Sequence, residues 1–311
     1  MKTTYWLYSL AILLLLSLLA AFGRWRREQS LRNKSLAASS TLKTCELLLH
    51  LLRDLQQHRG MSSAWLSGEA GFLPRLEAKQ KDIAALLPKI QREARREGGN
   101  DRAGLTANQF SLFVFRWQCL LDELPDLSPE QNIARHNQSI SRLLEWLSVL
   151  GELHLEPRVV ALPAAAVAMI GVARNFTHRL PQLSECLGQA RAIGSSVAAR
   201  RTCLPASRVK LMFLIGRAES LLQQAVMAQP GQGHTLQCQH AIELMAHTVR
   251  TRLLLSTGVL VSSLEYFELS TRAIEDVFAW IALCEKQLGA ALDGSEVAAT
   301  PGLAAVADAT S

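Results

Sequence analysis

The chain has 311 residues, of which 49% are hydrophobic, 19% charged and 6% aromatic. This is enough apolar material for one large or two small packed cores, and it excludes disorder for most of the chain. The 18 glycines and 10 prolines lie between long runs rich in Leu and Ala, which excludes collagenous and all-β chains and favours helices. The six cysteines contain no CxxC pair, so neither a disulfide framework nor a zinc module is indicated.

The net charge of +6 is concentrated near the N-terminus. The first 34 residues contain six Lys or Arg and one Glu, a net charge of +5, which leaves only +1 for the rest of the chain. A protein that binds nucleic acid through its phosphates needs a basic face, and the body of this chain has no such excess. We therefore expect no nucleic-acid partner. Because the basic residues follow an apolar segment, they indicate a membrane instead.

Residues 5–22 (YWLYSLAILLLLSLLAAF) are 18 residues without a charge, enough for a helix to cross most of a hydrocarbon layer about 30 Å thick. A cleaved signal peptide is the alternative, but the apolar stretch is longer than a usual signal core, and AFG is a poor cleavage site. Five Lys or Arg follow the segment and one precedes it. The positive-inside rule therefore predicts a single-pass membrane anchor, a basic linker over residues 23–37, and a cytoplasmic C-terminal part.

From about Ser39 onward, apolar residues recur at spacings of three and four, the pattern of amphipathic helices. The apolar stripes cover residues 42–55, 83–90, 110–124, 133–150, 159–176, 183–197, 209–226 and 235–288. Ser128 before Pro129 predicts one helix start, Glu156 and Pro157 open the second set of helices, and Pro181 predicts a break.

The short loops between these stripes are typical of antiparallel neighbours in a bundle. We therefore predict an all-α protein in which an N-terminal transmembrane helix is followed by about eight helices forming two four-helix bundles. Residues 38–288 make up this helical domain. The Ala- and Thr-rich residues 289–311 are predicted to be a disordered, low-complexity tail.

Three helical segments carry a family resemblance. Residues 51–69 (LLRDLQQHRGMSSAWLSGE) combine a leucine stripe, Gln, Arg-Gly and small hydroxyl residues before an apolar pair. Residues 183–197 (LSECLGQARAIGSSV) contain Glu, Gly-Gln, Arg-Ala and Gly, and residues 265–278 (EYFELSTRAIEDVF) form a closing helix. In this order and spacing they resemble the bacterial nitrate- and nitrite-sensing (NIT) domain family. His58 departs from the pattern, because family members usually carry an acidic or basic residue before the Arg-Gly pair.

The resemblance implies an all-helical sensor over residues 38–288 that binds nitrate or nitrite. We expect no enzyme, because the chain contains no nucleophile elbow, phosphate-binding loop or paired catalytic carboxylates. Such domains usually precede an output module, and residues 289–311 are too few to fold into one. We therefore expect a sensory protein anchored in the bacterial inner membrane by a single pass. It signals through a separate partner protein, and a homodimer is a further expectation.

The ligand that the resemblance implies is a planar monoanion, and a guanidinium matches it because its parallel N–H groups face two oxygens. Several arginines between two bundles repel one another when the site is empty. An anion that relieves this repulsion therefore shifts the packing of the bundles. By the resemblance we place Arg59, Arg191 and Arg252 around the nitrate. The secondary candidates, which have polar side chains near these positions, are Arg250, His58, Ser62 and Ser63.

Two alternatives to the cytoplasmic sensor stay open at this point. One is a ligand-free helical scaffold or adaptor that acts only through protein contacts, and the other is a receptor fragment whose domain faces the periplasm. For each arginine, the alternative is a solvated or ion-paired surface group. His234 and Cys238 have the i, i+4 spacing that a metal ion bridges, but no carboxylate completes the set. We therefore expect neither a metal ion nor a cofactor.

Overall fold

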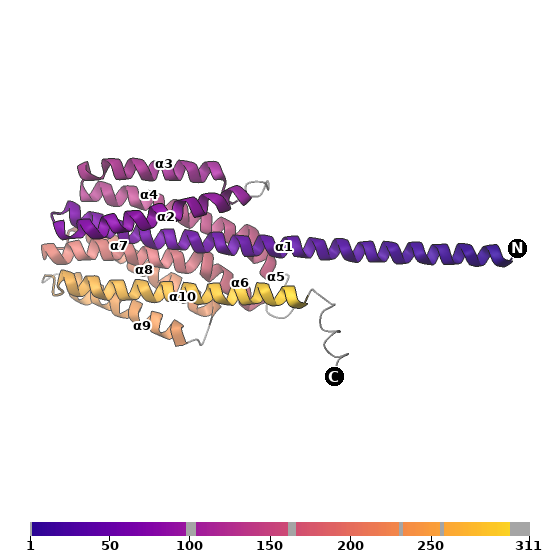
Figure 1. Cartoon of the computed structure of the whole chain (residues 1–311). Helices are drawn as coiled ribbons and strands as arrows, with labels where there is room; N and C mark the ends of the chain where they lie inside the picture. The colour runs from indigo at the N-terminus through magenta and orange to yellow at the C-terminus, as the bar shows by residue number, and fades with distance from the viewer. Residues whose placement is uncertain (1, 98–103, 161–165, 230–232, 256–257, 299–311) are drawn as a thin grey trace, which may run out of the picture.

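The structure is a computed structural model of the chain that describes residues 2–97, 104–160, 166–229, 233–255 and 258–298. Side chains are described for the same residues except 2–20, 27–37, 97, 166–167, 233–234 and 293–298. Every regular element in this part of the chain is helical (Figure 1), which confirms the predicted all-α class.

The α-helices are α1 (Lys2–Leu66), α2 (Leu73–Glu97), α3 (Ala107–Glu123), α4 (Pro129–Leu150), α5 (Glu156–Val160), α6 (Ala166–Arg174), α7 (Leu180–Arg200), α8 (Pro205–Ala228), α9 (Gly233–Thr248) and α10 (Ser263–Ala298). Three π-helical segments interrupt them, namely η3 (Gly151–Leu155), η4 (Asn175–Arg179) and η5 (Val249–Leu253). Two short 3₁₀ turns are η1 (Ala70–Phe72) and η2 (Leu124–Asp126). Helix α4 begins where predicted, because the Ser128 side chain caps the backbone N–H of Gln131.

The helices form two layers that share one apolar core. Helices α1 to α4 contact one another in the first half of the chain, and α7 to α10 contact one another in the second half. Helix α1 also packs against α7 and α10, so it joins the two groups (Figure 1). Its leucine stripe supplies the fully buried side chains Leu48, Leu52 and Leu55. The charged and polar residues discussed below therefore lie where α1 meets α7, inside the protein.

The predicted break at Pro181 is wrong, whereas α5 begins at Glu156, where the sequence predicted that the second set of helices opens. The chain stays helical from Pro129 to Val160 and from Ala166 to Arg200, with η3 ending two residues before Pro157 and η4 ending two residues before Pro181. A proline cannot donate to the carbonyl four residues earlier, and a π-helical turn changes the hydrogen-bond partners just before it. The helices therefore pass through both prolines without a loop.

Helix α1 extends far beyond the bundles toward the N-terminus (Figure 1). It includes both the predicted membrane segment, residues 5–22, and the predicted linker, residues 23–37. No helix of the described residues carries an apolar stretch long enough to cross a membrane. The side chains of residues 5–20 lie outside the described part, so the structure gives the transmembrane prediction no support and it stays a prediction.

Helix α10 continues past the predicted end of the domain at residue 288. It runs to Ala298, and Leu292 is buried against the bundle. The structure thus continues the helix ten residues into the segment that was predicted to be a disordered tail, because the apolar spacing continues for one more turn after Leu288. Residues 299–311 of the predicted tail lie outside the described residues.

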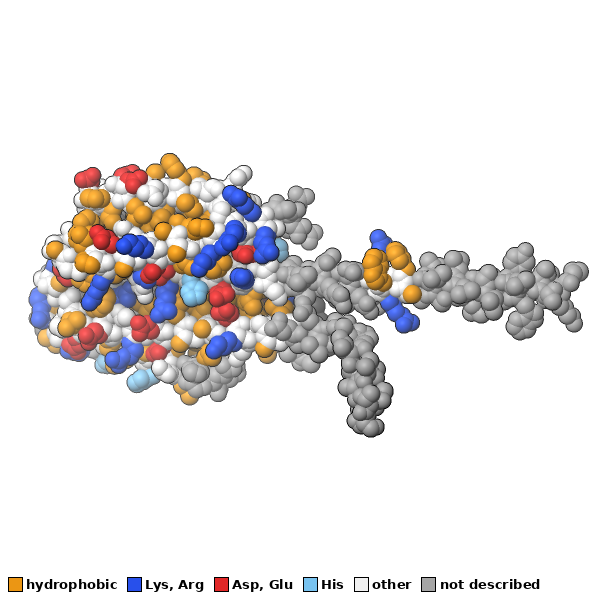
Figure 2. Space-filling view, in the orientation of Figure 1, with side chains coloured by type: hydrophobic (Ala, Val, Ile, Leu, Met, Phe, Trp, Pro, Cys, Tyr) orange, Lys and Arg blue, Asp and Glu red, His pale blue; other side chains and the backbone are white. Residues whose placement is uncertain are grey.

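Charged side chains of both signs are interspersed over the face of the bundles shown in Figure 2. This agrees with the net charge of +1 that the sequence leaves for the chain beyond residue 34. An excess of positive charge that attracts an anion must therefore be local, and the charged groups buried between α1 and α7 are the candidates for it.

Candidate functional site

Arg59 lies at the centre of the interface between α1 and α7. Its side chain is buried, with 1% of the residue exposed. Nη1 donates to Glu185 Oε1 over 2.6 Å and Nη2 donates to Glu185 Oε2 over 3.1 Å, which makes a bidentate ion pair between the two bundles. Nη1 also donates to Asn137 Oδ1 of α4. The charge of Arg59 is therefore balanced in the described structure, which the sequence reading of mutually repelling arginines did not anticipate.

Two glutamine amides complete the surroundings of Glu185. Gln189 Nε2 donates to Oε1 over 2.8 Å, and Gln56 Nε2 donates to Oε2 over 3.1 Å. Ser184 Oγ donates its proton to the Pro181 carbonyl, so its oxygen can only accept from Gln56 Nε2. Because Glu185 Oε2 is also an acceptor, the NH2 group of Gln56 must face both oxygens, and the orientation of its amide is fixed. This leaves Gln56 Oε1 as a buried acceptor without a donor among the described residues.

Arg191 follows Glu185 by six residues on α7, and its environment differs from that of Arg59. It is 8% exposed, its Nη1 donates to Thr271 Oγ1 of α10 over 3.0 Å, and its guanidinium lies 5.2 Å from the ring centre of Phe267. Burial and the neighbouring charge of Arg59 lower the pKa of Arg191 to about 10. No carboxylate of the described residues lies within ion-pair distance of Arg191. The buried cluster of Arg59, Arg191 and Glu185 therefore carries a net charge of +1.

Two glycines make room for this cluster. A Cβ at Gly188 would lie 2.9 Å from Arg59 Nη2, so the missing side chain lets the guanidinium rest on α7. A Cβ at Gly194 would lie 2.3 Å from the Tyr266 ring, whose hydroxyl donates to the Ala190 carbonyl. Gly194 thus allows α10 to approach α7 closely enough for its Thr271 to reach Arg191.

His58 is buried but points away from the arginines, into the first bundle. Gln80 Nε2 donates to His58 Nε2, His58 Nδ1 donates to His136 Nε2 over 2.8 Å, and His136 Nδ1 donates to the Asn132 carbonyl over 2.8 Å. This chain requires both imidazoles to be neutral. Burial lowers the pKa of His58 to about 3 and that of His136 to about 4. His58 therefore adds no positive charge to the site.

Ser62 and Ser63 are tied to the same bundle. Ser62 Oγ donates to the His58 carbonyl over 2.7 Å, and Asn132 Nδ2 donates to the hydroxyl oxygens of both Ser62 and Ser63. These hydroxyls join α1 to α4. Ser62 and Ser63 were secondary candidates for the nitrate site. In the structure their hydroxyls bind groups of α1 and α4 and not the guanidiniums of Arg59 and Arg191.

Arg252 and Arg250 are also outside the cluster. Arg252 forms an ion pair with Glu265 and Arg250 forms a bidentate pair with Glu219, with 40% and 42% of the two arginine side chains exposed. Both arginines lie on η5, at the end of the second bundle. The structure thus pairs Arg252 with a carboxylate of α10 and not with the buried cluster, because sequence spacing does not reveal which turn of a helix reaches the other bundle.

Several groups of the site were not assigned a role from the sequence. Gln56, Asn137 and Thr271 come from three different helices, and only folding brings them to the arginines. Glu185 was recognised as matching the family pattern, but not as the partner of Arg59. The sequence did contain a signal for this role, because Glu185 and Arg191 lie six residues apart on one largely apolar helix. A charged side chain on such a helix is usually buried only where it pairs with another charge or binds a ligand.

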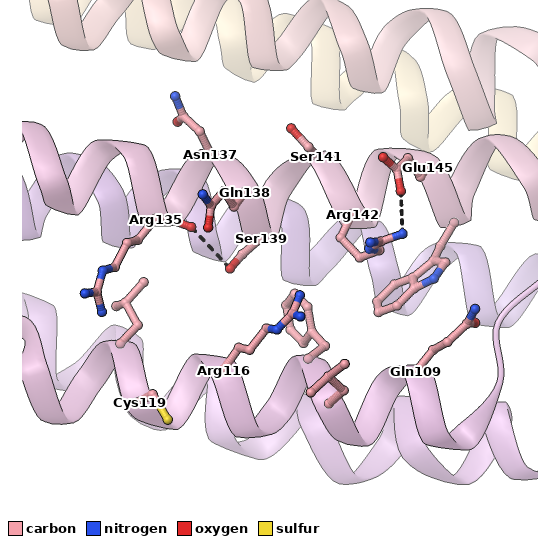
Figure 3. A pocket seen from close by; sticks show the side chains of 14 residues that line it. Gln109, Arg116, Cys119, Arg135, Asn137, Gln138, Ser139, Ser141, Arg142 and Glu145 are labelled. Atoms are coloured by element: carbon pink, nitrogen blue, oxygen red, sulfur yellow. Dashed lines mark hydrogen bonds and ion pairs between the residues drawn. The ribbon is translucent and has the colours of Figure 1, made fainter.

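A surface pocket of about 790 Å³ lies between α3 and α4 (Figure 3). Arg116 of α3 lines it together with Arg135 and Arg142 of α4. Arg135 is paired with Glu123 and Arg142 with Glu145, and all four of these side chains are more than 40% exposed. Exposed and paired guanidiniums bind an anion weakly. The uncompensated charge at Arg191 is therefore the stronger candidate.

The described residues contain no group of three His, Cys, Asp or Glu side chains placed to hold a metal ion. The side chain of His234, one of the two residues with metal-binding spacing, lies outside that part. Its spacing partner Cys238 is buried, and burial raises the pKa of its thiol to about 12. A protonated thiol is a poor metal ligand.

Comparisons with known proteins cover most of the chain. It resembles the solved structure of the NasR transcription antiterminator, with 20% sequence identity and a TM-score of 0.66 over 89% of this chain and 75% of that chain. At this identity the likeness shows the fold. The comparison with curated proteins gave no match. The family described as nitrate and nitrite sensing matches residues 50–292, and the chain therefore belongs to the nitrate- and nitrite-sensing (NIT) domain family.

Proposed function

We propose that the chain senses nitrate or nitrite by binding the anion beside Arg191 and Arg59, between the two bundles. The observation that carries this proposal is the buried guanidinium of Arg191, which has a hydroxyl and an aromatic ring as neighbours but, among the residues that the structure describes, no carboxylate in ion-pair contact. A buried charge without a counter-ion is costly, so a monoanion that pairs with it binds favourably. The net charge of +1 matches the charge of nitrate or nitrite.

The position of the anion follows from the hydrogen bonds already made. Gln56 Oε1 is a buried acceptor that receives no hydrogen bond from the described part of the chain, and nitrate has no donor to offer it. An anion beside Gln56 would therefore be repelled. On the other side of Arg59, Arg191 has N–H groups left after its bond to Thr271. We place the anion there, within reach of α1, α7 and α10.

Binding at this position links three helices that belong to different parts of the fold. Arg59 comes from α1 in the first bundle, whereas Arg191 and Thr271 come from α7 and α10 in the second. An anion held by both bundles favours one arrangement of α1 against α7 over others, which is the differential affinity that a sensor requires. The cluster contains no nucleophile beside a base, so we propose a sensory rather than an enzymatic role.

Helix α1 offers a route for the signal, because it runs without interruption from the site to the N-terminal end of the described chain. We propose that residues 5–22 anchor this helix in the bacterial inner membrane with the bundles in the cytoplasm. We also propose that a separate protein receives the signal. A protein fits this role better than a nucleic acid, because the chain beyond residue 34 has a net charge of only +1.

The anchor is tested by fusing alkaline phosphatase, which works only in the periplasm, after residue 298. We expect an inactive fusion and an active cytoplasmic reporter at the same position, because five Lys or Arg follow the apolar segment. Active phosphatase would place the bundles in the periplasm. Release of the full chain from membranes by high salt alone would show that residues 5–22 do not span them.

Anion binding is tested by calorimetric titration of the full chain in detergent with nitrate, nitrite and chloride. We expect nitrate and nitrite to bind and chloride to bind more weakly. Arg191→Lys keeps the charge but loses the planar pair of donors, so it should bind nitrate about tenfold more weakly while its melting temperature is retained. The exposed Arg250→Lys is the matched control and should bind like the parent.

A specific observation favours one alternative function. The guanidinium of Arg59 already donates to Glu185 and Asn137 without any ligand. A helical scaffold that acts only through protein contacts would have its buried arginine paired in this way. A parent chain that binds neither nitrate nor nitrite would favour this scaffold and refute the sensor.

A further inference from the structure

We propose that Glu185 determines the charge selectivity of the anion site, so that the site accepts monoanions and rejects dianions such as sulfate. This inference rests on the proposed function and assigns a role to a residue that does not itself contact the anion. The carboxylate contributes the one negative charge of the buried cluster, next to the two positive charges of Arg59 and Arg191.

Glu185 is a permanent part of the site rather than a group that an incoming anion displaces. Its two oxygens accept four hydrogen bonds, two from Arg59, one from Gln56 and one from Gln189. Its side chain is 8% exposed. A carboxylate held by four donors in a buried interface is costly to move, because each donor would lose its acceptor. The charge that Glu185 adds is therefore present when the anion binds.

The titratable groups next to the cluster, His58, His136 and Glu275, leave its net charge at +1. His58 and His136 are neutral in their hydrogen-bonded chain, as described above. Glu275 of α10 also acts on Arg191 electrostatically, but it is exposed and makes no ion pair with it. Water screens an exposed charge strongly and a buried one weakly. Arg59, Arg191 and Glu185 are thus the charges that an anion at this position meets.

Coulomb energy scales with the product of the charges, which makes selectivity predictable. One added unit of positive charge in the site acts twice as strongly on a dianion as on a monoanion. If Glu185→Gln raises the affinity for nitrate about tenfold, it should raise the affinity for sulfate about a hundredfold. The ratio of the two affinities then shifts about tenfold toward sulfate. Nitrate is planar and sulfate is tetrahedral, so repacking alone could also shift the ratio, but it would not shift it in opposite directions in variants that remove and add a negative charge.

Three variants of the full chain, titrated with potassium nitrate and sodium sulfate at constant ionic strength, test this prediction. Glu185→Gln should shift the ratio about tenfold toward sulfate. Gln189→Glu adds a negative charge beside Glu185 at a half-buried position that tolerates a polar side chain, and it should shift the ratio about tenfold the other way. Glu219→Gln removes an exposed carboxylate with the same bidentate geometry toward Arg250 and should leave the ratio unchanged.

The outcomes separate this inference from the proposed function. A parent that binds no nitrate refutes both. A parent that binds nitrate, with the same nitrate-to-sulfate ratio in Gln189→Glu and Glu185→Gln, refutes the role of Glu185 and leaves the anion site intact. If Glu185→Gln fails to fold, Gln189→Glu still decides, because an unchanged ratio in that variant also refutes the inference.

Discussion

Replacing Arg59 and replacing Arg191 should have opposite effects on stability, although both are buried arginines in one cluster. Arg59→Ala leaves the Glu185 carboxylate in the interface with two amide donors and no cation in hydrogen-bond contact. Removing one partner of a buried ion pair costs about 3 to 5 kcal/mol of the free energy of unfolding. In a domain of this size that lowers the melting temperature by roughly 6 to 20 °C. Mutual repulsion of the arginines in an empty site, which the sequence analysis expected, would by itself make the truncation of Arg59 neutral or stabilising.

Arg191→Met removes a guanidinium that has no ion pair. The chain loses one hydrogen bond to Thr271 and the contact with Phe267, each about 1 kcal/mol. It no longer has to bury an uncompensated charge next to Arg59, and this offsets most of the loss. We therefore expect the free energy of unfolding to stay within about 1 kcal/mol of the parent, while nitrate binding is abolished.

Thermal unfolding followed by circular dichroism, in a buffer free of nitrate and nitrite, measures both effects. The double variant Arg59→Met with Glu185→Leu is the internal check, because an apolar pair of similar volume is often as stable as a buried ion pair. It should recover most of the loss caused by Arg59→Ala. Equal destabilisation by Arg59→Ala and Arg191→Met would show that Arg191 has a structural counter-ion, and the reasoning for an anion site would fail.

Two further predictions concern the packing and the histidine pair. Gly194→Ala should lower the free energy of unfolding by about 2 to 3 kcal/mol in a thermal melt, because its Cβ would overlap the Tyr266 ring; an unchanged melting temperature would contradict the close approach of α7 and α10. Burial lowers the pKa values of His58 and His136 to about 3 and about 4, below about 6.5 in the unfolded chain. The unfolded chain then binds more protons as pH falls, so the stability present above pH 6.5 should decrease by roughly 2 to 4 kcal/mol between pH 7 and pH 5. His58→Gln should remove about half of that pH dependence, whereas the exposed His240→Gln should retain it in full.

The helices of this protein could be predicted from the sequence because the signal for them is local. Leu49, Leu52 and Leu55 are spaced so that one face of α1 is apolar, and they are all buried in the structure. Ser128 marks the start of α4 because its side chain caps a backbone N–H three residues away. Motif resemblance added the family and two arginines, Arg59 and Arg191, that the structure places at one interface.

The ends of the helices were less predictable. Pro157 and Pro181 are local signals for a break, yet π-helical turns before both prolines let the helices continue. These turns pack against each other, since a Cβ at Gly151 would lie 2.2 Å from Thr177 Oγ1. Packing between two segments 26 positions apart therefore overrides the local preference of each proline.

Only the tertiary structure decided which charges meet. The sequence by itself determined an all-helical chain, its apolar faces and its membership of a family of anion sensors, because periodicity and motifs depend on residues a few positions apart. The pairing of Arg59 with Glu185 joins residues separated by 126 positions, and the exposure of Arg252 depends on how η5 sits at the end of its bundle. A buried charge is balanced or unbalanced by whatever the fold brings within a few ångströms of it. The uncompensated positive charge at Arg191 is for this reason a property of the folded interface.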